Sequence, residues 1–181
     1  MTERLKRIVI TGPESTGKSV LTKQLADYYK TNFLPEYART YIENLNRAYD
    51  YNDLVIIAKM QIKLEKEASK KASNFLFIDT GLIITKIWFQ EVFNKYPDWL
   101  DTSIIDYLPD FYLICNCDLA WENDSVRENG SDKQRKYLMD RYIKEIESYK
   151  TPYYIISGQD KVRLKNAINF IDNHYKLTTV H

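Results

Sequence analysis

Cysteine, glycine, proline and histidine are all scarce in this chain of 181 residues, which contains 2, 5, 5 and 2 of them respectively. So few glycines and cysteines exclude a collagen-like chain and a small scaffold held together by disulfides. Two cysteines without a partner pair of histidines do not make a zinc site. Free thiols favour a reducing compartment, so we expect the cytoplasm as the location.

Long hydrophobic runs and an excess of charge of one sign are also missing. The longest purely apolar stretches are about six residues, far below the length of a membrane span. The first residues, MTERLKRIVITG, contain no apolar signal core. The 26 basic and 25 acidic side chains leave a formal net charge of +1, which disfavours a general nucleic-acid binder. We therefore expect a small-molecule substrate and neither a nucleic-acid nor a membrane partner; the oligomeric state is not predicted.

Short apolar runs alternate with amphipathic segments along the whole chain, which predicts one domain over residues 1–181. Strands are predicted at 7–11, 32–34, 75–78, 111–115 and 153–156, and helices at 18–30, 37–46, 54–73, 83–96, 101–108, 133–150 and 161–175. Val20, Leu21, Leu25 and Ala26 are expected on the buried face of the first helix, and Asp53 as the cap of the third. Apolar strands alternating with helices indicate an α/β fold, here a three-layer, five-stranded parallel sheet with helices on both faces.

The strongest motif follows the first predicted strand. Gly12-Pro13-Glu14-Ser15-Thr16-Gly17-Lys18-Ser19 fits the Walker A pattern G-x-x-x-x-G-K-[ST] between a strand and a helix. Glycines let the backbone curl so that several N–H groups face one cavity, and the next helix adds its positive N-terminal end. The sequence therefore predicts ATP and Mg²⁺ as cofactors, with Lys18 on the phosphates and Ser19 on the metal. The predicted nucleotide contacts are Gly12, Glu14, Ser15, Thr16, Gly17, Lys18, Ser19, Val20 and Arg135.

The remaining motifs narrow the class of P-loop protein. No N-K-x-D segment for reading guanine is present, and the small size disfavours a large motor or AAA-type ATPase. A short P-loop chain with five strands looks like the nucleoside and nucleotide monophosphate kinases, which bind an acceptor beyond strands two and three. In that group a mobile lid carrying arginines closes over the phosphates, and residues 118–135 after strand four are the expected lid.

Two carboxylates follow the second and third strands. Glu36 and Asp79 should lie where the γ-phosphate meets the acceptor hydroxyl. Because His174 and His181 both lie near the end of the chain, a carboxylate must serve as the base. Asp79, together with Ser19, suits the role of holding the metal. Glu36 is the preferred base, although the sequence leaves open which of the two acids is the base. The predicted catalytic residues are Lys18, Glu36, Asp79 and Arg127.

Four segments together carry a family resemblance. G-P-E-S-T-G-K-S, E-Y-A-R, F-I-D-T and W-E-N-D-S-V-R resemble the ribosylnicotinamide kinase domain of the bifunctional NAD-regulatory proteins, from about Arg7 to Phe170. The resemblance implies ATP-dependent phosphorylation of the ribose 5′-hydroxyl of nicotinamide riboside, giving nicotinamide mononucleotide. Where the family commonly has Asp-Gly, this chain has Asp124-Ser125. The implied acceptor-binding residues are Glu36, Tyr37, Arg39, Gln61, Trp121 and Asp124.

The acceptor's cationic ring would favour an aromatic face. Trp121, Tyr37 and Trp88 are the candidates, with core packing as the alternative for Trp88. Two other functions stay open, namely a P-loop kinase for another nucleoside or small alcohol and a non-catalytic module that senses ATP or NAD. Family members often add an adenylyltransferase or a helix-turn-helix domain, for which this chain has no room, so we expect a stand-alone kinase or an excised domain.

Overall fold

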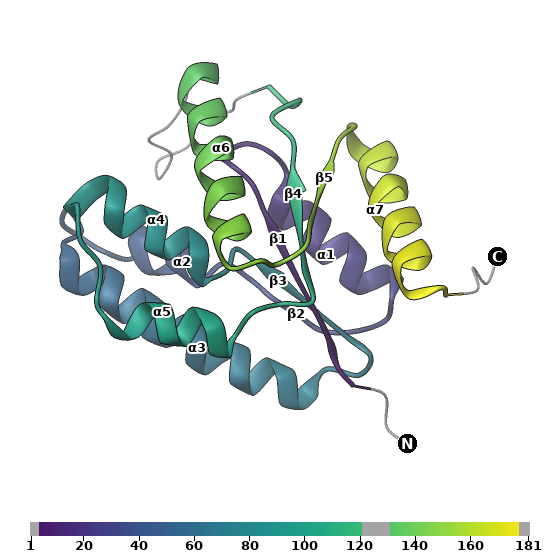
Figure 1. Cartoon of the computed structure of the whole chain (residues 1–181), viewed down its shortest axis with the longest axis horizontal. Coiled ribbons are helices and arrows are strands. Elements are labelled where there is room, and N and C mark those ends of the chain that lie inside the picture. Colours follow the sequence, from purple (N-terminus) through teal and green to yellow (C-terminus); the bar gives the residue numbers. More distant parts are fainter. Residues whose placement is uncertain (1–3, 121–130, 178–181) are drawn as a thin grey trace.

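The computed structural model describes residues 4–120 and 131–177, which form a sheet between two layers of helices (Figure 1). The strands are β1 Lys6–Thr11, β2 Phe33–Leu34, β3 Phe75–Asp79, β4 Phe111–Cys115 and β5 Tyr153–Ile156. The helices are α1 Lys18–Tyr28, α2 Tyr37–Glu43, α3 Tyr51–Lys71, α4 Leu82–Phe93, α5 Trp99–Asp106, α6 Asp132–Ser148 and α7 Asp160–Tyr175.

The five strands form one parallel sheet in the order β2-β3-β1-β4-β5. The central strand β1 pairs with β3 on one side and with β4 on the other, so that Ile10 lies beside both Asp79 and Leu113. Because all strands run the same way, the segments that follow them meet at one edge of the sheet. The structure thus confirms the predicted α/β class, including the helices on both faces.

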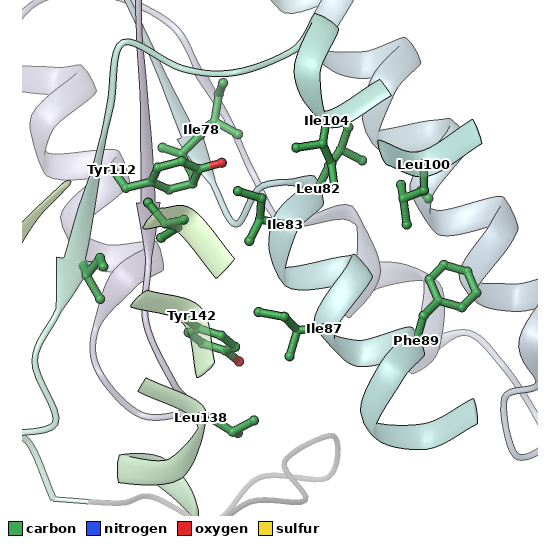
Figure 2. Packing of buried hydrophobic residues seen from close by; sticks show 14 of the residues in the cluster. Ile78, Leu82, Ile83, Ile87, Phe89, Leu100, Ile104, Tyr112, Leu138 and Tyr142 are labelled. Carbon is green, nitrogen blue, oxygen red and sulfur yellow. The ribbon is translucent and has the colours of Figure 1, made fainter. Parts of the chain in front are cut away.

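Each face of the sheet has its own apolar core, because alternate residues of a strand point to opposite faces. In β1, Val9 belongs to the core under α3, α4, α5 and α6, whereas Ile8 and Ile10 belong to the core under α1 and α7. Figure 2 shows the first core, in which Ile87 of α4 and Tyr142 of α6 pack in one cluster. Burial of both faces explains why the strands are almost wholly apolar.

Several sequence predictions differ from the structure in detail. Val20 is 62% exposed, so its placement on the buried face of α1 was wrong; that face consists of Leu21, Thr22, Leu25 and Ala26. The cap of α3 is Asp50 and not Asp53, which instead closes a capping box from the third helical position. Helix α4 ends at Phe93 because Asn94 adopts a left-handed conformation, three residues before the predicted end.

The predicted lid is described only at its two ends. Residues 121–130, among them Trp121, Asp124 and Arg127, lie outside the described residues, and Asp132–Arg135 already form the first turn of α6.

The two cysteines, Cys115 and Cys117, are both free thiols. Within the described ranges, no helix combines the length and the apolar character needed to span a bilayer.

Candidate active site

The loop after β1 has the backbone shape of an anion cradle. Gly12 has φ +150°, and a Cβ atom placed there would lie 2.8 Å from both the Cys115 carbonyl oxygen and Thr16 Oγ1. Ser15 and Gly17 also have positive φ, at 56° and 73°. Thr16 Oγ1 donates to the Pro13 carbonyl oxygen at 2.8 Å, so this carbonyl is held by the loop itself. A curled backbone of this kind turns consecutive amides toward one cavity.

Helix α1 begins where the cradle ends. Its N-cap is Gly17, which supplies no side chain to accept hydrogen bonds from the first amides of the helix. Those donors and the positive end of the helix dipole are therefore available to an anion. Lys18 is half-buried at this end, whereas Ser19 and Val20 are exposed. The exposure of Val20 fits the predicted position beside a nucleotide better than a position in the core.

Asp79 ends β3 next to the cradle. The residue is 2% exposed, and its carboxylate accepts hydrogen bonds from the hydroxyls of Ser19 and Thr80. Burial raises the pKa of the Asp79 carboxyl, while the Lys18 ammonium and the two hydroxyls act in the opposite direction. The contact of Asp79 with Ser19 places two oxygen atoms that can bind a metal ion side by side.

The Ser19 and Asp79 oxygens fit a magnesium ion, which takes oxygen ligands and keeps several waters. Among residues 4–120 and 131–177, no three acidic, cysteine or histidine side chains gather into a metal site of their own.

Glu36 follows β2 and occupies the N-cap position of α2. Burial raises the pKa of its carboxyl above the usual value of 4.5. The Lys18 ammonium and the Arg39 guanidinium lower this pKa, whereas the charges of Asp79 and Glu14 raise it further. These interactions show that the side chains at the ends of β1, β2 and β3 share one electrostatic neighbourhood. A carboxylate with a raised pKa there is suited to accepting a proton.

Gln61 of α3 lies at the same edge of the sheet. It is 5% exposed, and its Nε2 donates to the Thr80 carbonyl oxygen at 3.2 Å. Thr80 has φ 63°, and its N–H donates to the Ile10 carbonyl oxygen, which ties the turn after β3 to β1. The structure therefore places Gln61 beside Asp79–Thr80 rather than on the solvated face of its helix.

Of the other residues predicted to contact the acceptor or its ring, Tyr37, Arg39 and Trp88 lie among the described residues. The Tyr37 ring is half-buried, with its centroid 6.0 Å from that of Tyr41. Arg39 is exposed and its Nε lies 2.8 Å from Oε1 of Glu43 on the same helix. Trp88 donates from Nε1 to the Tyr49 hydroxyl at 3.1 Å and packs against the larger core, so packing is the role that the structure shows for it.

Arg135, a predicted nucleotide contact, is bonded to the residues around it in the structure. It is 1% exposed in the first turn of α6, and its guanidinium donates to the Leu119 carbonyl oxygen at 2.8 Å. It also lies 3.7 Å from the Asp132 carboxylate. The side chain is thus bonded to the segment leaving β4, and its contact with a nucleotide stays a prediction.

Sequence reasoning missed two residues that belong to the site's surroundings. Arg163 of α7 contacts the cradle, and its position on the apolar stripe with Ala167 and Ile171, at four-residue spacing, was an available signal. Tyr142 of α6 is buried. Its burial raises the pKa of its hydroxyl, and the negative charges of Glu14, Glu36 and Glu91 raise this pKa further.

The family described as AAA domain matches residues 7–163 of this chain. The small size of the chain disfavours a large AAA-type ATPase, whereas this match covers a domain of fewer than 181 residues. The chain is also 26% identical over 160 residues to the trifunctional NAD biosynthesis/regulator protein NadR of Escherichia coli strain K12. This alignment covers 86% of the chain and 39% of the relative, so the chain spans about two fifths of the curated relatives that it matches. The relatives are named trifunctional, whereas the family resemblance was to bifunctional proteins.

Solved structures show the same fold. A crystal structure of NadR protein in complex with NR has a TM-score of 0.83 at 20% identity and covers 96% of this chain and 52% of that one. Thymidylate kinase from Ehrlichia chaffeensis has a TM-score of 0.62 at 15% identity, with 93% and 99% covered. The fold is thus that of small P-loop kinases, one of which it matches over nearly its whole length.

Proposed function

The chain belongs to the AAA domain family, and on that premise we propose that it is a kinase for nicotinamide riboside. In this proposal residues 1–181 act as one P-loop kinase domain that uses ATP with Mg²⁺ and forms nicotinamide mononucleotide. The observation that carries it is that Lys18, at the start of α1, interacts electrostatically with Glu36 and Asp79, which end or follow the adjacent strands β2 and β3 beside an anion cradle.

The choice of acceptor draws on the relatives. The E. coli relative is named for NAD biosynthesis, and a similar structure was solved with NR, which we interpret as nicotinamide riboside. The half-buried Tyr37 ring lies one residue from Glu36, where an aromatic face could pack on the cationic nicotinamide ring. The same neighbourhood is rich in carboxylates, which also favours a cationic acceptor.

Phosphate binding is the task of the loop and of Lys18. The cradle amides and the Lys18 ammonium would hold the β- and γ-phosphates and compensate the charge that develops during transfer. Ser19 and Asp79 would hold Mg²⁺, whose contribution is to neutralise phosphate charge. Catalysis by positioning and charge compensation suits this site, because phosphoryl transfer needs little covalent help from the protein.

Proton transfer is assigned to Glu36. Its carboxylate accepts the proton of the ribose 5′-hydroxyl while that oxygen forms a bond to the γ-phosphorus and the bond to the ADP oxygen breaks. Asp79 is less suited to this step, because its carboxylate is already bonded to Ser19 and Thr80. Gln61 would orient the acceptor from the side of α3, since its amide is fixed at Thr80.

A substrate panel tests the proposal. ADP release is measured with MgATP and nicotinamide riboside, cytidine, thymidine or uridine, using Lys18→Ala as the inactive control. We expect nicotinamide riboside to give the highest kcat/KM and the variant to lose several orders of magnitude in turnover. A clear preference for another nucleoside would refute the acceptor but leave a kinase, whereas ATP binding without transfer to any acceptor would favour a sensor.

A further inference from the structure

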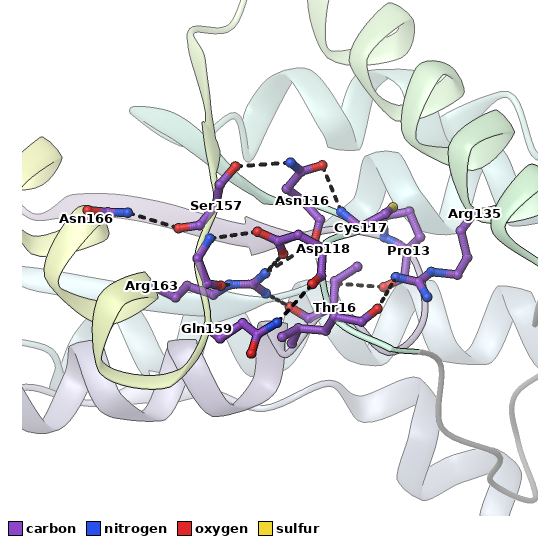
Figure 3. A network of polar contacts seen from close by, with 12 residues as sticks. Pro13, Thr16, Asn116, Cys117, Asp118, Arg135, Ser157, Gln159, Arg163 and Asn166 are labelled. Carbon is purple, nitrogen blue, oxygen red and sulfur yellow. Dashed lines mark hydrogen bonds and ion pairs between the residues drawn. The ribbon is translucent and has the colours of Figure 1, made fainter.

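Arg163 makes an unusual set of contacts at the cradle (Figure 3). It is 4% exposed, and its guanidinium donates to the carbonyl oxygens of Thr16, Gly158 and Asn116, with 2.7 Å to Gly158 and 3.3 Å to Asn116. It also forms an ion pair with Asp118. One side chain of α7 thereby joins the cradle after β1 to the segments that follow β4 and β5.

The contact with Thr16 fixes one peptide group of the cradle. The carbonyl of Thr16 and the N–H of Gly17 belong to the same peptide, which is trans and planar. In such a peptide the two groups point in opposite directions. Since Arg163 holds the carbonyl on the outer side of the loop, the Gly17 N–H is directed away from α7, toward the inner side where a phosphate would lie. A cation on the carbonyl also polarises the peptide and strengthens its N–H as a donor.

Asp118 supplies the matching negative charge. A buried guanidinium is costly unless it is paired and its donors are satisfied. The Asp118 carboxylate meets this need, and its Oδ2 also accepts from the Gly158 N–H at 2.7 Å. The Leu119 side chain packs over Gly17, where an added Cβ would be 3.1 Å from Leu119 Cδ1. The residues leaving β4 therefore hold both the arginine and the glycine in place.

We propose that Arg163 and Asp118 are positioning residues for phosphate binding, which orient and polarise the Thr16–Gly17 peptide of the cradle. They act through the backbone and touch no substrate atom. The inference deepens the proposed function but rests only on its nucleotide site, and it does not depend on which acceptor the enzyme uses.

NMR of the Gly17 backbone amide tests this proposal. With ¹⁵N-glycine labelling the chain gives at most five backbone amide signals, because it contains five glycines. In Arg163→Gln the Gly17 signal should move, and its further shift on adding the ATP analogue AMP-PNP with Mg²⁺ should shrink. The dissociation constant for AMP-PNP should rise about tenfold, the expected cost of losing one charge-assisted hydrogen bond. The Gly81 signal should stay in place, since Gly81 packs on Val9 and Tyr112 and not on Arg163.

Arg7→Gln is the matched control. Arg7 is also a largely buried arginine paired with a carboxylate, Glu65, and bonded to backbone carbonyls, but it lies at the opposite end of β1. This variant should lose stability without moving the Gly17 signal or the affinity for AMP-PNP. Arg163→Lys keeps the charge and should recover part of the affinity, although one ammonium cannot make all the contacts.

Asp118→Asn is the second variant, in case Arg163→Gln does not fold. It keeps Arg163 but removes its counter-charge, so it should shift the Gly17 signal less and in the same direction. The proposal is overturned if folded Arg163 or Asp118 variants bind AMP-PNP within twofold of the wild type with Gly17 unmoved. Loss of activity toward nicotinamide riboside alone would refute the acceptor and leave this inference standing.

Discussion

At the scale of single residues, the two acids of the site differ in their surroundings, and on this difference we base the separate roles proposed for them. Asp79 is bonded to the hydroxyls of Ser19 and Thr80, which suits a metal ligand. Glu36 has a carboxyl whose pKa is raised chiefly by burial, which suits a general base. Sequence reasoning located both acids, because each follows an apolar strand. It could not separate their roles, since these depend on contacts between strands.

Replacing Glu36 by glutamine should lower turnover far more than it weakens ATP binding. The amide cannot accept the hydroxyl proton, so kcat should fall by about 10²–10⁴-fold while the KM for ATP changes little. Steady-state kinetics with both substrates varied separately measure the two effects. If only the KM for ATP changed, the base would have to be sought elsewhere, with Asp79 as the next candidate.

Ionisation of the Glu36 carboxyl should lower the free energy of unfolding of the nucleotide-free protein as the pH rises. Its pKa is higher in the folded state than the usual 4.5, so the folded protein binds the proton more tightly than the unfolded chain. The stabilisation by this proton is complete below pH 4.5 and is lost as the pH rises through the folded-state pKa. Glu36→Gln should therefore be at least as stable as the wild type in urea at pH 7.5. The exposed Glu67→Gln is the control, and a destabilised Glu36→Gln protein would contradict the raised pKa.

At the scale of elements, the sequence predicted which segments are helices and strands better than where they end. The five strands and seven helices of the described residues all match predicted segments, because the strands are short apolar runs and most of the helices repeat apolar residues with a period of about 3.6. The ends of helices depend on single capping residues. Asn94 ends α4 through a left-handed conformation, and Asp50 rather than Asp53 caps α3. A sequence with aspartate at both positions does not say which one is the cap.

Asp53 should stabilise the junction between α2 and α3 through its charge. Its carboxylate accepts from Arg47, from the Tyr41 hydroxyl at 2.8 Å and from the Asp50 N–H at 2.7 Å. These contacts hold the pKa of the Asp53 carboxyl well below its usual 3.8. The stabilisation is present above pH 3.8 and is lost as the pH falls through the lower folded-state pKa.

Asp53→Asn should accordingly lose about 1–2 kcal/mol of unfolding free energy at pH 7. The difference from the wild type should shrink below about pH 4, because the carboxyl of the unfolded chain begins to be protonated there while that of the folded protein is still charged. Urea unfolding at several pH values measures it, with the exposed Asp140→Asn as control. A loss that stays constant from pH 7 to pH 3 would show that charge is not the cause.

Gly12 should be indispensable to the cradle. An alanine Cβ at this position would collide with the Cys115 carbonyl oxygen, which belongs to the rigid central sheet and cannot give way. Gly12→Ala should therefore displace the loop and weaken ATP binding by about tenfold or more, with a smaller effect on thermal stability. Equal ATP affinity in the folded variant would mean that the loop tolerates the Cβ by moving elsewhere.

At the scale of the whole molecule, the sequence predicted the parallel sheet, and it also predicts that ligands bind at the edge where the strands end. It did not predict the partners of Arg163, because Thr16, Asp118 and Gly158 come together only through the strand order β2-β3-β1-β4-β5. Local patterns carry no information on contacts between residues 147 positions apart. A charged side chain on an apolar helical stripe was the available sign of such a contact.

The central claim is that the loop between β1 and α1 binds a polyphosphate, and titration calorimetry tests it most directly. Wild-type protein with Mg²⁺ should bind ATP at one site with a dissociation constant between about 1 μM and 1 mM. In Lys18→Ala that constant should rise by about tenfold or more. No binding heat with either ATP or GTP in the presence of Mg²⁺ would contradict the account.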